Sequence, residues 1–526
     1  MKSRSFPRRA FHAASIQTGL LLGAWDRFAH AAWTDAPIQS YGVMAGEVTR
    51  HSAVLWGRPD QESQMFVQWD TDEGFGRPTR VSGPHGSHLA DYTSHCRIDG
   101  LPAGERIHYR VAFQNGSGAL SDWELGSFST ASDSMEDVFF AWSGDTAGQG
   151  FGINPEWGGM RIYDAIAKIA PQFFVHSGDM IYADNPMPKE MPMADGSVWK
   201  NIVTEAKSHA ANSLSDFRGN FQYNLMDDCV RAFHRTVPLY VQWDDHETTN
   251  NWYPQQHLRL RKDSAAYDAM ETARQLSERA KQAFFEYTPI APMPSGEKRI
   301  YRKMARGPLL DLFLLDLRSY RGPNSANHQS EITDESAILG VEQMRWLKRS
   351  LAESRAVWKV LCCDMPLGVI VGDNMEGKPY YEAVANGKSD APSGRELEIA
   401  ELLSWMKDAD IKNTLWITAD VHYSAAHYYD PQRAVRKGSF QPFWEFVAGP
   451  LHAGTFGPNE LDGTFGPEVR FQWAPKPGTK LPLPPSAGMQ SFGTIRIDGR
   501  TKRLTAELRG LDGSVLPNGT IEVEAE

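Results

Sequence analysis

The chain has 526 residues, of which 41% are hydrophobic and 11% aromatic, so it can bury a large core and form two or more domains. Its formal net charge of −11 argues against a nucleic-acid-binding protein, because phosphate backbones are held by clusters of Lys and Arg that this sequence lacks. The same acidity suits a protein that holds cations.

Residues 1–32 have the three parts of an export signal. A basic start is followed by a moderately apolar stretch, residues 13–25, and by the small-residue cleavage signal Ala29-His30-Ala31. Arg8-Arg9 followed by Phe11 resembles a twin-arginine signal, whose export machinery carries proteins already folded. An ordinary secretory signal that happens to hold two arginines is the alternative. We expect an exported protein, periplasmic or secreted, with no membrane span in its mature form, because no later stretch reaches the roughly 18 apolar residues that a span requires.

Residues 37–132 are predicted to form a small all-β domain. Short alternating runs at 53–56, 65–69 and 107–113 are separated by clusters of Gly, Pro, Asp and Asn. Leu101-Pro102-Ala103-Gly104 before Tyr109 resembles the turn and buried tyrosine of an immunoglobulin or fibronectin III-like β-sandwich, with Trp56 as its core tryptophan. Such a domain usually acts as a spacer or lid.

Apolar runs alternate with helical patterns from residue 136 to residue 526, which predicts an α/β layered domain. The strand candidates are residues 138–142, 173–175, 237–243, 309–315, 357–363, 415–418 and 443–447. The tail, residues 492–526, returns to short alternating runs with Asp-Gly turns, which predicts antiparallel hairpins at the edge of the sheet.

Helical patterns lie between several of these strands. One face collects Val341, Met344, Leu347 and Leu351, and a second stripe collects Ile399, Leu402, Leu403 and Met406. We expect both stripes to pack into the core. Residues 255–285 are a longer charged segment, expected to form a helical cap.

Carboxylates follow four of the predicted strands. Ligands collect at the carboxyl ends of strands in open α/β sheets. One Asp after a strand is often only a helix N-cap, but four such ends on one rim would repel each other strongly unless a cation neutralised them. The four ends are Ser143-Gly144-Asp145, His176-Ser177-Gly178-Asp179-Met180-Ile181-Tyr182, Asp244-Asp245-His246-Glu247 and Ala419-Asp420-Val421-His422. They predict a metal site.

These motifs, in this order, resemble those of the alkaline phosphatase D family within the calcineurin-like metallophosphoesterases. The matching segments are Gly178-Asp179-x-x-Tyr182, Trp243-Asp244-Asp245-His246-Glu247 with Asn250-Asn251, Asp316-Leu317-Arg318-Ser319-Tyr320-Arg321, and Ala419-Asp420-Val421-His422. The Gly-Asp-x-x-Tyr element is shared with purple acid phosphatases. The resemblance covers roughly residues 37–526 and implies a metallophosphoesterase αββα sandwich preceded by a small β domain.

The resemblance also implies a binuclear metal centre. Asp179 would bridge two cations, because a carboxylate has two oxygens and can hold both about 3.5–4 Å apart. The first site would be completed by Asp145, Tyr182 and His422, with Tyr182 bound as the phenolate that Fe³⁺ stabilises. The second, oxygen-rich site would be served by Asp245 and Asp420 and would suit Ca²⁺, with Mn²⁺ or Mg²⁺ as substitutes.

One departure from the family pattern affects the first metal. Family members often have cysteine in the loop after the first strand, whereas this chain has Gly144-Asp145. The expectation of iron therefore depends on Tyr182. Whether Asp244 or Asp245 binds the metal stays open at this stage. The other aspartate is expected to support the site from behind the ligands, together with Glu247.

The implied reaction is hydrolysis of small phosphate esters by in-line attack of a metal-bound hydroxide on phosphorus. His246 would stabilise or protonate the leaving oxygen. Asn250 would ligate the second metal or contact phosphate. Arg318 and Arg321 would hold the phosphate, unless an arginine pairs with Asp316 to fix a loop instead.

Two other functions compete with a general phosphomonoesterase or phosphodiesterase. One is a specialist on phospholipid, nucleotide or cell-wall phosphodiesters, decided by the shapes of residues 185–235 and 255–295. The other is an exported binding or adhesion protein that uses its β domain and has a purely structural metal site.

Overall fold

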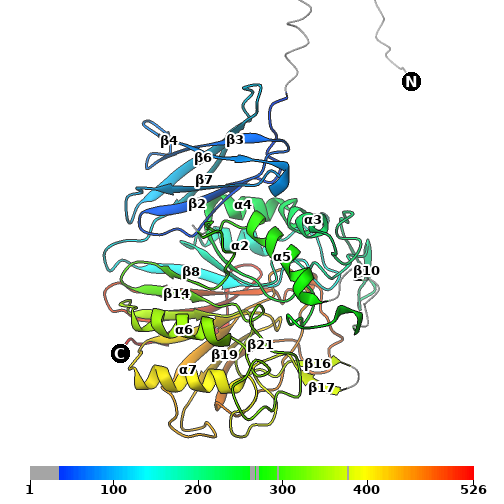
Figure 1. The fold of residues 1–526 in the computed structure, drawn as a ribbon, viewed down its shortest axis with the longest axis vertical. Coiled ribbons are helices and arrows are strands. Elements are labelled where there is room, and N and C mark those ends of the chain that lie inside the picture. The colour runs from blue at the N-terminus through cyan, green and yellow to red at the C-terminus, as the bar shows by residue number, and fades with distance from the viewer. Residues whose placement is uncertain (1–34, 261–266, 268–271, 293–294, 376–377) are drawn as a thin grey trace, which may run out of the picture.

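The computed structural model describes residues 35–260, 267, 272–292, 295–375 and 378–526. The predicted export signal, residues 1–32, lies outside these ranges. The described strands form two large sheets, a four-stranded sheet and two small hairpins. Helices lie on the outer sides of the two large sheets, and the N-terminal β domain stands at one end of the molecule (Figure 1).

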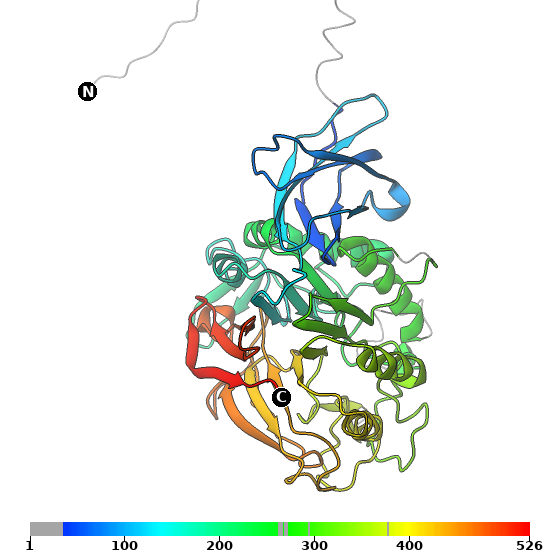
Figure 2. The same ribbon diagram turned by 90° about the vertical axis from the view of Figure 1, so that its left-hand side faces the viewer.

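The first large sheet has nine strands, and its centre is parallel. Strands β8, β9 and β12 pair in parallel, whereas the last three strands of the chain add to β8 as antiparallel neighbours, as the Asp-Gly turns predict. These last strands form one edge of the sheet (red in Figure 2). In spatial order the strands are β24 (Val515–Val523), β23 (Leu504–Gly510), β22 (Ser491–Ile497), β8 (Val138–Ser143), β9 (Phe174–Ser177), β12 (Leu239–Gln242), β1 (Val43–Gly46), β2 (Ser52–Gly57) and β5 (Ser94–Asp99).

The second large sheet has seven strands, four of them parallel. Its spatial order is β13 (Arg302–Ala305), β14 (Leu310–Leu314), β15 (Trp358–Cys362), β18 (Thr414–Thr418), β20 (Phe443–Val447), β19 (Ser424–Tyr429) and β21 (Pro467–Trp473). Every predicted strand run is found as a strand. The run at 237–243 is shorter than predicted, because its strand begins at Leu239 and Trp243 already belongs to the loop that follows.

The main core lies between the two large sheets. Phe140, Val175, Leu312, Val360 and Ile417 are fully buried there. Because side chains alternate along a strand, the residue next to Val175, Phe174, faces the helices on the other side of the sheet. Both faces of the central strands are therefore buried, which explains their continuous apolar sequences.

Helices cover the outer face of each large sheet. Four of them pack on the nine-stranded sheet: α2 (Ile162–Lys168), α3 (Leu214–Leu225), α4 (Asp228–Thr236) and α5 (Ala273–Tyr287). Two pack on the seven-stranded sheet: α6 (Gly340–Ala352) and α7 (Glu396–Asp408). This order of layers confirms the predicted αββα sandwich (Figure 1). Short 3-10 helices occur at His88–Ala90, Leu258–Leu260 and Pro485–Ala487.

Two details of the predicted helices need correction. Val341 is 65% exposed, so the apolar stripe of α6 is formed by Met344, Leu347 and Leu351 without it. In the described part of the expected cap at 255–285, the α-helix begins at Ala273, and that helix is part of the core. Residues 261–266 and 268–271 of the same segment lie outside the described residues.

The N-terminal domain is a β-sandwich. Its four-stranded sheet packs on β1, β2 and β5, and Tyr109 is fully buried between the two layers. Trp56 does not lie in this core, contrary to the prediction. Its indole nitrogen donates to the carbonyl of Glu286, 2.7 Å away in α5, because on β2 it is the neighbouring Leu55 that faces the sandwich. The four strands are β4 (Thr79–Gly86), β3 (Ser63–Asp70), β6 (Arg106–Gln114) and β7 (Glu124–Ser129).

Two small hairpins complete the strand inventory. They are formed by β10 (Glu190–Pro192) with β11 (Val198–Lys200), and by β16 (Gly372–Met375) with β17 (Lys378–Tyr381). Among the described residues, no helix combines the length and the apolar character needed to cross a membrane.

The sandwich and the α/β layers share one continuous sheet. β1 pairs in parallel with β12, with Gly46 opposite Leu239, and the amide of Glu47 donates to the carbonyl of Leu239 at 3.2 Å. The carboxylate of Glu47 also lies 2.6 Å from the guanidinium of Arg302 on β13. The domain limits of 37–132 and 136–526 stay a prediction, but hydrogen bonds of the sheet cross the line between them.

Gly46 tests this junction. A Cβ atom at this position would lie 2.5 Å from Cγ of Pro289 and 2.8 Å from the carbonyl oxygen of Leu239. We expect Gly46→Ala to lower the free energy of unfolding by about 1–3 kcal/mol, because backbone atoms on both sides must move. Urea denaturation measures the change, with Gly116→Ala as control, since nothing lies within 4 Å of a Cβ there. Equal stability of the two variants would contradict the tight junction.

Candidate metal centre

The ends of strands β8, β9, β12 and β18 meet at one rim and bring most of the predicted ligands together. Ligand atoms of Asp145, Asp179 and His422 all lie within 4.8 Å of one another. Asp179 also forms such a group with Asp245 and His246. A third group consists of Asp244, Asp245 and Asp420. Asp179 therefore belongs to two ligand groups, which is the position that a carboxylate shared by two cations would occupy.

The backbone turns sharply at these ligand positions. Asp145, Asp179, Asp420 and His422 have φ angles of 70°, 51°, 68° and 60°. L-residues rarely adopt this left-handed region, and the strain of about 1–3 kcal/mol for each persists only where the surroundings hold it. Such turns directly after a strand direct the side chains over the rim instead of along the loop.

Tyr182 lies against both clusters. Its hydroxyl is 2.8 Å from Nε2 of His422, and its ring centroid is 4.2 Å from that of His246. Burial, with the nearby charges of Asp179 and Asp145, raises the pKa of Tyr182 well above its usual value. The phenol therefore stays protonated unless a strongly polarising cation replaces its proton.

The carboxylates cannot all be ionised without a counter-ion. Burial raises the pKa values of Asp145, Asp179 and Asp420 well above the ordinary range, and neighbouring carboxylates add to the effect. Within the described part of the chain, Oδ2 of Asp145 and Oδ1 of Asp245 find no hydrogen-bond partner. Unpaired buried carboxylate oxygens, combined with an imidazole and a phenol, form a donor set that fits a pair of cations.

His246 is held by a carboxylate that the sequence analysis missed. Its Nδ1 lies 2.6 Å from Oδ1 of Asp184, and Oδ2 of the same carboxylate accepts the backbone amide of Asn250 at 2.7 Å. Burial opposes a charge on His246, but Asp184 and Asp245 outweigh it and raise its pKa to about 9. The sequence held a signal for this contact, because Asp184 stands only two residues after Tyr182 in the loop that follows β9.

Glu247 ties the two carboxylate loops together. Its side chain accepts the amides of Asp179 at 3.1 Å, Met180 at 2.5 Å and Asp244 at 2.7 Å. Its position matches the supporting role expected for it. Three accepted hydrogen bonds fix the loop after β9 to the loop after β12 and thereby fix the backbone of Asp179.

Arg318 and Arg321 do not reach the pocket, so the predicted phosphate contacts need correction. Arg318 is fully buried, with a nitrogen 2.5 Å from Asp244, and it also pairs with Glu382. Arg321 is 1% exposed and lies behind Glu382. The alternative pairing with Asp316 is not seen either, because Asp316 accepts the backbone amide of Arg318 at 3.1 Å and not its guanidinium.

Two further carboxylates, Asp364 and Glu382, belong to this buried network. Asp364 lies 3.6 Å from Arg318, and Glu382 lines the pocket. Asp364 follows strand β15 and matches the pattern of carboxylates after strands, so the sequence held a signal for it. Glu382 follows the short hairpin β16–β17, and no pattern in the sequence marks it.

The clusters open into a pocket of about 690 Å³. Asn250, the third predicted substrate contact, lies in its lining and is exposed. The neighbouring Asn251 donates its amide to Asp245 at 2.5 Å. The pocket therefore combines the metal-ligand clusters, His246 and a predicted substrate contact.

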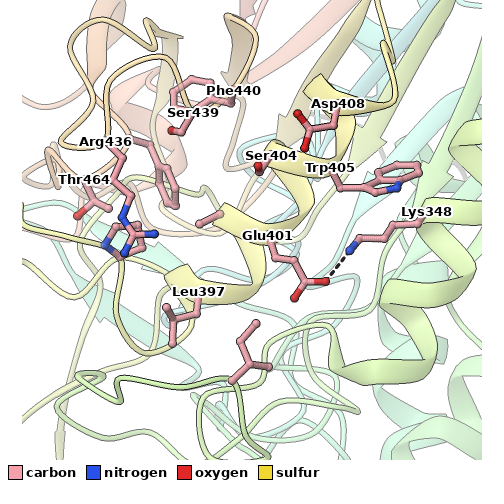
Figure 3. A pocket seen from close by; sticks show the side chains of 14 residues that line it. Lys348, Leu397, Glu401, Ser404, Trp405, Asp408, Arg436, Ser439, Phe440 and Thr464 are labelled. Carbon is pink, nitrogen blue, oxygen red and sulfur yellow. Dashed lines mark hydrogen bonds and ion pairs between the residues drawn. The ribbon is translucent and has the colours of Figure 1, made fainter.

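A second hollow of about 590 Å³ lies on the outer side of α7. Figure 3 shows the ion pair of Lys348 and Glu401 across it, 2.5 Å long, with Trp405 and Arg436 around it. None of the acid and histidine clusters found among the described residues contributes to its lining. Of these two hollows, the pocket over the clusters is the one that His246 and the grouped carboxylates line.

Comparisons with known proteins agree with this geometry. The sequence profile of the PhoD-like phosphatase family matches residues 140–508, and that of the PhoD-like phosphatase N-terminal domain matches residues 26–132. Alkaline phosphatase D of Bacillus subtilis (strain 168) is 26% identical over 447 residues, which cover 80% of this chain and 71% of that protein.

Two solved structures share the fold. The structure of PhoD matches with a TM-score of 0.67 at 20% sequence identity and covers 94% of this chain and 93% of that one. The purple acid phosphatase PPD1 from yellow lupin (Lupinus luteus) seeds matches with a TM-score of 0.55 at 12% identity, over 93% of this chain and 74% of that one.

Arg318 gives a test of the buried network that is independent of catalysis. We expect Arg318→Ala to lower the free energy of unfolding by about 3–5 kcal/mol, because Asp244 and Glu382 lose their buried cationic partner. Arg503→Ala is the control, because its ion pairs with Glu522 and Glu524 are exposed and should contribute less than about 1 kcal/mol. Chemical denaturation measures the free energy of unfolding of both variants. Equally small decreases in the two would refute the structural role of Arg318.

Proposed function

Because this chain belongs to the PhoD-like phosphatase family and is a metal-dependent phosphoesterase, we propose that its reaction takes place at the clusters on the β8, β9, β12 and β18 ends. The observation that carries this proposal is the position of Asp179, whose carboxylate lies within 4.8 Å of ligand atoms of Asp145 and His422 in one group and of Asp245 in another. The family confirms the resemblance inferred from the motifs. The rival function, a binding protein with a structural metal, gives way to the enzyme.

Each predicted ligand keeps a place in this proposal. Asp145, Tyr182 and His422 would hold one cation and Asp245 and Asp420 the other, with Asp179 within reach of both groups. Support comes from the low pKa of His422, which burial lowers to about 4, so that a neutral imidazole nitrogen is available to a metal. When bound, the cations activate water as the nucleophile and neutralise charge that develops on the phosphoryl oxygens.

His246 is proposed to donate a proton to the leaving oxygen. It lines the pocket, and its contact with Asp184 occupies Nδ1 and raises the pKa of the imidazole. The other ring nitrogen is then the one that can transfer a proton. Asn250 is proposed to contact the phosphoryl group from the rim, while Arg318 and Arg321 act at a distance by holding Asp244 and Glu382.

The metals proposed are Fe³⁺ beside Tyr182 and Ca²⁺, Mn²⁺ or Mg²⁺ beside Asp420. Tyr182 favours a trivalent ion, because only strong polarisation replaces the proton of so deeply buried a phenol. Gly144-Asp145 in place of the frequent family cysteine makes the first site harder in donor character, which is compatible with iron. Asp245 and Asp420 supply oxygen donors alone, as calcium, manganese and magnesium prefer.

Export is proposed from residues 1–32, through the twin-arginine machinery, to the periplasm or the exterior. The substrates proposed are small phosphate esters, both monoesters and diesters. A twin-arginine route would suit the site, since folding around the cations can then be completed before export.

Substitution of Asp179 and His246 tests the two roles separately. Asp179→Asn should remove measurable activity and reduce the metal content below two ions per chain, because both clusters lose a ligand. His246→Ala should keep both metals and lose about 10²–10⁴-fold in rate, and Asp184→Asn should lose a smaller factor. Metal analysis and hydrolysis of a chromogenic monoester and diester measure these effects.

The matched control is Asp195→Asn, an exposed carboxylate in the turn between β10 and β11 whose hydrogen bonds among the described residues come from Ser197. It should leave metals and rate unchanged. Full activity of either Asp179→Asn or His246→Ala would refute the role assigned to that residue.

Replacement of Tyr182 tests the identity of the first metal. If iron binds the phenolate, the protein has a visible tyrosinate-to-iron absorption band, and Tyr182→Phe should remove that band while the fold is kept. The measurement is the visible absorption spectrum of the wild-type protein and of Tyr182→Phe at equal iron content. A band that survives the substitution would contradict ligation by Tyr182.

A further inference from the structure

One wall of the pocket is apolar and is built from three loop segments fixed side by side. Thr455 and Leu483 exchange backbone hydrogen bonds of 2.9 and 3.0 Å, which joins residues 481–483 to residues 455–457. On the other side, the amide of Ile370 donates to Glu460 at 3.0 Å. These bonds place Val371, Phe456, Pro458 and Leu481 in the pocket lining.

The wall begins at the metal centre and ends at the pocket mouth. The ring of Phe456 stands edge-on to the ring of His422, with centroids 5.3 Å apart. Leu481 is 39% exposed, although large apolar side chains tend to be buried. An ester whose phosphoryl group lies at the clusters would therefore extend its organic group along Phe456 towards Leu481.

The charges in the lining limit what that organic group can be. Among the described residues, the lining contains four carboxylates and two histidines but neither Lys nor Arg. The polar residues at the rim are amides: Gln149, Asn185, Asn250, Asn251 and Asn459. A second phosphate or carboxylate on the substrate would meet amides and neither Lys nor Arg among the described residues of the rim, and its loss of hydration would be poorly compensated there.

We propose that the preferred substrates are esters of a single phosphoryl group whose organic group is uncharged and apolar, and that Leu481 determines this specificity. The inference deepens the proposed function and depends on it. Contact with Leu481 removes apolar surface of the substrate from water, and the gain rises with the length of the organic group. No hydrogen bond described in the structure joins Leu481 to the ligand clusters or to His246. Its substitution should therefore leave the metal ligands and His246 in position.

The test uses methyl, butyl and hexyl phosphate, whose leaving groups have similar basicity, with release of inorganic phosphate as the readout. For the metal-loaded wild-type enzyme we expect kcat/KM to rise about tenfold from methyl to hexyl phosphate, less than full burial of five methylenes would give, because the wall covers one side only. Leu481→Asn should bring the ratio of kcat/KM for hexyl phosphate to kcat/KM for methyl phosphate close to one, at unchanged metal content.

Two further variants sharpen the result. Leu125→Asn, at an exposed leucine of β7 that is 55% exposed, should keep the full dependence on chain length. Leu481→Lys should raise kcat/KM for ADP relative to hexyl phosphate, because it adds the missing cation at the mouth. Equal kcat/KM for the three esters with the wild-type enzyme, or an unchanged dependence in Leu481→Asn, would overturn the inference. Failure to hydrolyse any of these esters at full metal loading would instead overturn the proposed function.

Discussion

The structure depends on carboxylates that are buried closer together than their mutual repulsion permits without cations. Asp145, Asp179 and Asp245 come from loops of the nine-stranded sheet, whereas Asp420 and His422 follow a strand of the seven-stranded sheet. Cations held among them would therefore link the two sheets of the sandwich. The same attraction that prepares the site for phosphate would also hold the layers together, so that metal loading and stability of the fold are expected to be coupled.

The support of the centre is as important as the ligands. Glu247 fixes two loops through backbone amides, and Arg318 compensates the charge of Asp244 from behind. Both are buried, and neither reaches the phosphoryl group. Because the rigid sandwich bears the strain of the left-handed ligand positions, the ligands need not reorganise when a substrate enters.

Most of the architecture could be predicted from the sequence because its signals are local. Apolar runs buried on both faces mark the central strands, and carboxylates directly after those runs mark the rim. What could not be predicted depends on register and on irregular loops. The direction of Trp56 follows from which face of β2 is turned to α5, and the burial of Arg318 follows from the path of the loop that brings Glu382 over it. Neither has a periodic signature.

The continuous sheet changes what the N-terminal domain is. If the chain were cut after residue 132, β12 would lose its neighbour and present an unpaired edge, with the amides and carbonyls of a strand open to other chains. Such edges promote aggregation. The sandwich thus works as a protective cover for the catalytic sheet, and selection for solubility alone would keep the two parts in one polypeptide even if the sandwich never touched a substrate.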